Sequence, residues 1–82
     1  MEIQEFIDFI KDYGELKGKI RDEERYKIGK FLIVISNEGF CVAENTRIIY
    51  FFSFSKRKEI FSVRSLETIF QEIKDICSLF AK

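Results

Sequence analysis

The sequence has no histidine, proline or tryptophan, and only two cysteines and four glycines occur among its 82 residues. Without histidine, a Ser-His-Asp triad, a Cys-His pair and a histidine-ligated metal site are all excluded. Two cysteines alone do not complete a structural zinc site, and the sequence contains no Gly-Lys-Ser/Thr phosphate loop. These absences predict a protein that is not an enzyme and that uses no metal and no cofactor.

Neither sign of charge is in excess, because 14 lysines and arginines balance 14 aspartates and glutamates. A general nucleic-acid binder normally carries a basic excess, which this chain lacks. The charges are nevertheless segregated along the sequence. Residues 1–15 carry five carboxylates and one lysine, whereas residues 46–64 carry five cations and one glutamate. Ordinary solvated surface explains both segments, and each is also a candidate contact region.

Long apolar runs are absent as well, since no stretch approaches the ~20 residues that a membrane-spanning helix needs. The first residues are acidic and amphipathic, unlike a secretory signal or a transit peptide. Two cysteines without such a signal are typical of reduced thiols in a cytoplasmic protein. A length of 82 residues predicts one domain over residues 1–82. The absence of a long apolar run predicts that the protein has no membrane partner.

Helical periodicity is present at both ends of the chain. Apolar side chains from Ile3 to Tyr13 recur at helical spacing and predict a helix over 2–13, which Gly14 ends with a left-handed cap. Ser65 stands where an N-cap residue is expected, and the apolar residues after it predict a second helix over 66–80.

Apolar and β-branched residues dominate the centre of the chain and predict strands over 30–35, 40–44 and 47–55, with 59–63 as an optional fourth. Residues 15–29 leave three alternatives open: a loop, a short helical turn, or an edge strand with a charged hairpin. The predicted fold class is α+β. An antiparallel meander of three to four strands lies between an N-terminal and a C-terminal helix (α-β-β-β-(β)-α), and both helices cover one face.

Side chains alternate between the two faces of a strand, so sequence parity assigns each residue to a face. The apolar row from Ile48 to Phe54 is expected to face the helices, as are the small residues Cys41 and Ala43. The open face then carries an apolar patch that marks a candidate interaction site. Its predicted members are Phe40, Val42, Ile49 and Phe51. Two alternatives remain: residues 15–29 fold across the patch, or the parity is reversed.

Charged side chains supply two further candidate contact regions. A basic set alternates with aromatic residues, which suits stacking on bases together with phosphate contact. Its members are Arg47, Lys56, Arg57 and Lys58. The acidic set lies on the polar side of the first predicted helix and suits a basic partner surface. Its members are Glu5, Asp8, Asp12 and Glu15.

The order of elements is similar to that of the double-stranded-RNA-binding domain. That family has a lysine-rich motif at the start of its last helix, where this chain reads Ser65-Leu66-Glu67-Thr68. The likeness is therefore one of element order alone.

In size, composition and helix–meander–helix order, the chain resembles small anti-CRISPR proteins of phages and mobile elements, although no motif carries this resemblance. The resemblance implies a non-enzymatic inhibitor that binds a protein partner, sterically blocking a bacterial nucleic-acid-guided nuclease. The alternatives are a small RNA- or DNA-binding domain that uses the basic turn, and a homodimeric assembly subunit.

Overall fold

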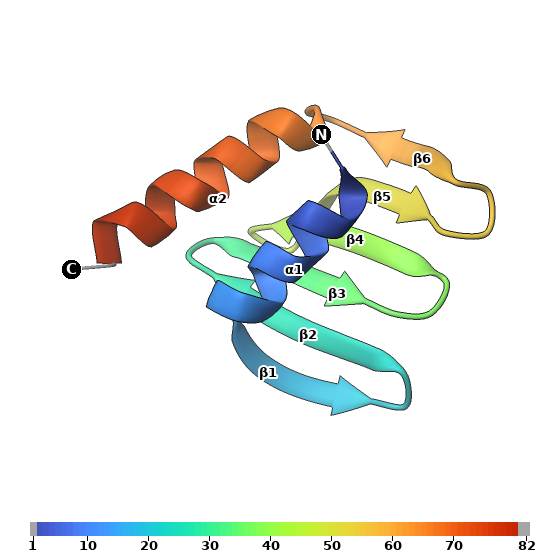
Figure 1. Cartoon of the computed structure of the whole chain (residues 1–82), viewed down its shortest axis with the longest axis horizontal. Helices are drawn as coiled ribbons and strands as arrows, with labels where there is room; N and C mark the ends of the chain where they lie inside the picture. Colours follow the sequence, from blue (N-terminus) through green and yellow to red (C-terminus); the bar gives the residue numbers. More distant parts are fainter. Residues whose placement is uncertain (1, 81–82) are drawn as a thin grey trace.

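A computed structural model describes residues 2–80 of the chain. Six strands form one antiparallel sheet in which each strand pairs with the next along the chain, between two terminal helices (Figure 1). The elements in order are α1 (Ile3–Tyr13), β1 (Glu15–Ile20), β2 (Glu23–Ile28), β3 (Phe31–Ile35), β4 (Gly39–Glu44), β5 (Arg47–Ser53), β6 (Lys58–Ser62) and α2 (Leu66–Phe80). The predicted α+β class is confirmed, whereas the predicted number of strands is too low.

The two missing strands lie in the segment that the sequence left undecided. β1 and β2 form a charged hairpin at one edge of the sheet, with a positive φ of 58° at Arg21 in the turn. Tyr26 and Ile28 point from β2 into the core and are buried, while Lys27 between them is polar. An antiparallel strand with one face in solvent needs apolar residues on its other face alone, so few of them are enough to hold the hairpin on the sheet.

The core lies between the sheet and the two helices. The Phe6 ring of α1 stacks on Phe40 of β4, with the ring centroids 5.3 Å apart, and meets Phe70 of α2 edge-on at the same distance. Ile10 and Ile73 are fully buried in the same cluster. Because one side chain contacts both the sheet and α2, the two helices share a single core on one face of the sheet (Figure 1). No helix in residues 2–80 is long and apolar enough to cross a membrane.

The ends of the helices follow different rules. The backbone N–H of Thr68 donates to Ser65 Oγ at 3.2 Å, so the predicted N-cap of α2 is confirmed. The left-handed cap predicted at Gly14 is wrong, because its φ is −78° and its backbone is extended. Glycine is nevertheless needed there, because an added Cβ would lie 2.6 Å from the carbonyl oxygen of Ile10.

Candidate functional site

The face of the sheet opposite the helices is open. Residues that pair across an antiparallel ladder point to the same face, so the register defines rows of side chains on it. One row crosses the sheet from β2 to β6 and consists of Arg25, Val34, Cys41, Phe51 and Phe61. The next row consists of Lys27, Leu32, Ala43 and Ile48. Both rows change from charged on β2 to apolar on β3 and the strands beyond it.

The apolar part of these two rows is here named the open-face patch. It consists of Leu32, Val34, Cys41, Ala43, Ile48, Phe51 and Phe61. Ile48 and Phe61 are the most accessible members, with 52% and 48% of their surface exposed, and the other five are partly exposed. Within residues 2–80, both helices pack on the other face of the sheet. The patch is therefore an apolar surface that faces solvent.

Three of the four predicted patch residues lie elsewhere. Phe40 and Val42 are only 1% and 0% exposed, because β4 turns its large side chains towards the helices and its small ones outward. Ile49 is also buried, next to an irregularity where the β4–β5 register shifts between Val42 and Ala43. Phe51 does lie on the open face, as predicted. The parity of β4 is therefore the reverse of the predicted one, which the sequence analysis gave as an alternative.

The predicted basic set is split between two places. Lys56, Arg57 and Lys58 are exposed at the turn between β5 and β6, whereas Arg47 begins β5 at the opposite end of that strand. Arg64, the cation just before α2, is separate from this set, and its guanidinium contacts Glu44 and Glu72 at 3.0 and 3.1 Å. The structure therefore brings together only the three residues of the turn.

The acidic set lies mostly where the sequence placed it. Glu5, Asp8 and Asp12 are exposed on α1 and line a shallow hollow there with Phe9. Glu15 does not belong to this helix. It begins β1 and forms an ion pair with Lys17 at 3.2 Å.

The open-face patch is apolar apart from the thiol of Cys41. Its one nucleophile is Cys41, and burial raises the pKa of this thiol, so the protonated form predominates at neutral pH. Burial also raises the pKa of Cys77, which lies on α2 away from the patch. No group of three or more potential metal ligands occurs among the residues that the structure describes.

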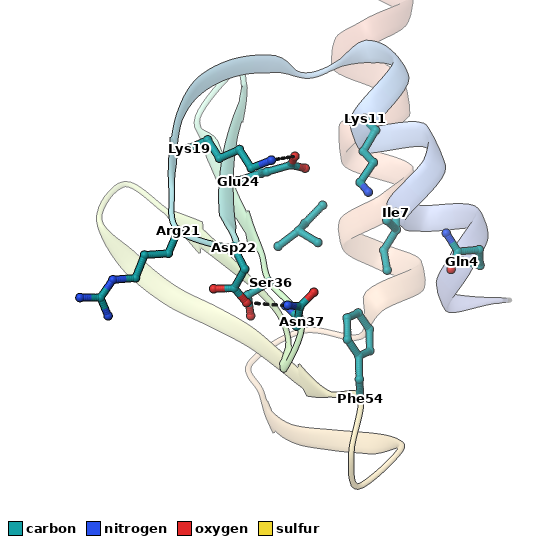
Figure 2. Close-up of a pocket in the computed structure, with 11 residues that line it drawn as sticks. Gln4, Ile7, Lys11, Lys19, Arg21, Asp22, Glu24, Ser36, Asn37 and Phe54 are labelled. Atoms are coloured by element: carbon teal, nitrogen blue, oxygen red, sulfur yellow. Dashed lines mark hydrogen bonds and ion pairs between the residues drawn. The ribbon is translucent and has the colours of Figure 1, made fainter.

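A second depression lies on the helix side of the sheet, between α1 and the β1–β2 hairpin (Figure 2). It is here named the hairpin cleft. Ile7, Ile35 and Phe54 provide its apolar lining, and charged side chains from α1 and the hairpin stand around it. The sequence interpretation missed this cleft, because one of its walls is the hairpin that it did not assign.

No protein-family model, curated protein or solved structure matches the chain.

Proposed function

We propose that this protein is a non-enzymatic binding module that recognises a protein partner with the open-face patch. The observation that supports this proposal is a contiguous apolar surface spanning four neighbouring strands on an otherwise uncovered sheet face. Small soluble domains seldom expose such surface without a use for it, because its removal from water favours association.

The composition of the patch favours protein over nucleic acid as the partner. Five of its seven members are aliphatic or carry a thiol, and these side chains do not stack on bases as aromatic rings do. The neighbouring cations are already engaged within the chain. Arg25 lies 3.4 Å from Glu23, and Lys27 donates to the carbonyl oxygen of Gly29 at 2.6 Å. Few charges next to the patch are therefore left for phosphate contacts.

Blocking a bacterial nuclease sterically is one use of such a surface, and the anti-CRISPR-like role remains part of this proposal. A steric inhibitor needs no catalytic group. It needs an apolar centre that excludes water and a charged border that fixes its orientation. Arg25 and Lys27, each held by a partner within the chain, form a fixed polar border on the β2 side of the patch.

The test is affinity capture from a bacterial lysate with the tagged wild type and two matched variants, each first shown to be folded by circular dichroism. Phe61→Ser removes an exposed patch member, and Leu79→Ser removes an equally apolar side chain that is 75% exposed on α2. We expect one protein to be retained by the wild type and by Leu79→Ser, in the presence of nuclease, and to be lost with Phe61→Ser.

Three outcomes would count against the proposal. Capture that is equal for Phe61→Ser and the wild type would place the binding surface elsewhere. Capture that disappears with nuclease, and falls steeply with salt, would indicate nucleic acid and the basic turn at Lys56–Lys58. A wild type of twice the monomer mass in sedimentation, reduced to a monomer by Phe61→Ser, would show that the patch binds a second copy.

A further inference from the structure

The hairpin cleft lies on the face of the sheet opposite the open-face patch and combines apolar and charged side chains, as a small-molecule site does. Ile7 from α1 and Ile35 from β3 are nearly fully buried and form its base, and the partly exposed Phe54 closes one end. In Figure 2, Ile7 and Phe54 face the space between α1 and the β1–β2 hairpin, which form the two walls of the cleft. The apolar part of the cleft is small, and polar side chains surround it.

Both carboxylates that line the hairpin cleft already have partners within the protein. Glu24 accepts a hydrogen bond from the Tyr26 hydroxyl at 3.0 Å, and its other oxygen lies 3.7 Å from Lys19 Nζ. Asp22 accepts the backbone N–H of Asn37 at 3.0 Å. Burial, and then the hydrogen bond to Glu24, raise the pKa of Tyr26, whose hydroxyl stays protonated and continues to donate.

Two cations of this cleft, Lys11 and Arg21, have no such partner among residues 2–80, and of these Lys11 points into the cleft. Its side chain extends from α1 towards the cleft, and it makes no ion pair or hydrogen bond with any residue in 2–80. Arg21, the remaining cation of the lining, points away from the cleft in Figure 2. One positive charge, standing beside an apolar base, is thus left unmatched.

We infer that the hairpin cleft binds a small-molecule monocarboxylate with an apolar body. The carboxylate pairs with the ammonium of Lys11, and the apolar body lies on Ile7, Ile35 and Phe54. A phosphate dianion fits less well, because its second negative charge would approach Asp22 and Glu24, while Lys19 is paired with Glu24 and Arg21 points away. An amine fits less well because Lys11 repels it. This inference does not depend on the open-face patch.

The test is a titration of the ¹⁵N-labelled protein at low salt with three probes, monitored through the backbone amide signals. Hexanoate carries the proposed chemistry, hexylammonium has the same chain with the opposite charge, and inorganic phosphate has the charge without the chain. We expect hexanoate to saturate with a Kd of about 1 mM, an affinity typical of a small ligand in an open site. Its shifts should centre on Ile7, Lys11, Ile35 and Phe54, and the other two probes should bind at least about fivefold more weakly.

Two exposed-lysine variants make the titration specific. Lys11→Gln removes the proposed ion pair and should weaken hexanoate binding about fivefold, the factor that corresponds to one exposed ion pair. Lys56→Gln removes an equivalent charge from the β5–β6 turn and should leave binding unchanged. Shifts that do not saturate, that centre on the open-face patch, or that are equal for hexanoate and hexylammonium would overturn the inference. Equal binding by Lys11→Gln and the wild type would overturn it as well.

Discussion

Arg64 Nη1 lies 3.0 Å from Glu44 Oε1, and this contact ties the segment before α2 to the end of β4. The other oxygen of Glu44 lies 2.6 Å from Lys30 Nζ, and Glu72 of α2 approaches both cations. Four charged side chains thus join the β2–β3 turn, β4 and α2 at one end of the sheet. The hydrogen bonds from Lys30 and then Arg64 hold the pKa of Glu44 below its ordinary value.

Replacing Glu44 with glutamine should reduce stability at neutral pH and have little effect in acid. The folded-state pKa of Glu44 is lowered, so its contribution is fully present above the unfolded-state pKa of about 4.3 and is lost as the pH falls through the lower folded-state value. Urea unfolding midpoints of the wild type and Glu44→Gln, measured from pH 7 to pH 3, should therefore converge at low pH. Glu38→Gln, at an exposed turn residue, is the control and should match the wild type throughout. A constant difference at every pH would contradict this account.

Replacing Ser65 with alanine should cost about 1 kcal/mol of unfolding free energy, because the first turn of α2 loses the hydroxyl that accepts the N–H of Thr68. Ser65→Asp keeps an acceptor at the same position and should restore most of the loss, since a carboxylate also suits the N-terminus of a helix. The measurement is urea unfolding at pH 7. Equal losses for both variants would show that the hydroxyl does not cap the helix.

Local sequence patterns were sufficient to predict the two helices and the three central strands. The buried side of α1 is defined by the helical spacing of its own apolar residues, Ile3, Phe6, Ile7 and Ile10. The N-cap of α2 is also local, because Ser65 accepts a hydrogen bond from Thr68 within the same turn. The sequence pattern did not assign the β1–β2 hairpin, because a hairpin at the edge of a sheet needs little apolar surface. Only the alternation of Tyr26 and Ile28 signalled it, within a segment dominated by charge.

Local sequence patterns could not predict which face of the sheet each strand residue lies on. Parity within one strand says which residues share a face, but the choice of face depends on turns and on register shifts between strands. Shifts occur in three of the five strand pairs, including the one between Val42 and Ala43. The packing of Phe6 on Phe40 then decides the face of β4, and that contact joins residues far apart in the sequence. The hairpin cleft depends on the same tertiary arrangement.

Replacement of two glycines by alanine should change the stability in opposite directions. A Cβ on Gly39 would overlap the carbonyl oxygen of Phe52 on the neighbouring strand, whereas a Cβ on Gly18 would meet nothing within 4 Å. Gly39→Ala should therefore lose about 2 kcal/mol or more, because backbone must move to relieve the overlap. Gly18→Ala should change stability by about 1 kcal/mol at most, in the stabilising direction, because alanine restricts the unfolded chain. Thermal unfolding of both variants checks the contrast. Similar losses at the two positions would show that β4 and β5 are not packed this closely at Gly39.

The assignment of faces, on which the proposed function rests, can be tested with two phenylalanines on adjacent strands. Phe40 is 1% exposed and its ring is surrounded by other aromatic rings, so Phe40→Ala should cost about 3–5 kcal/mol through lost burial and the cavity left behind. Phe51 lies on the open face and is partly exposed, so Phe51→Ala should cost less, about 1–2 kcal/mol. Urea unfolding at pH 7 measures both values. Phe40→Leu provides a milder change at the same position if the alanine variant does not fold. A larger loss at position 51 than at position 40 would reverse the two faces and remove Phe51 from the open-face patch.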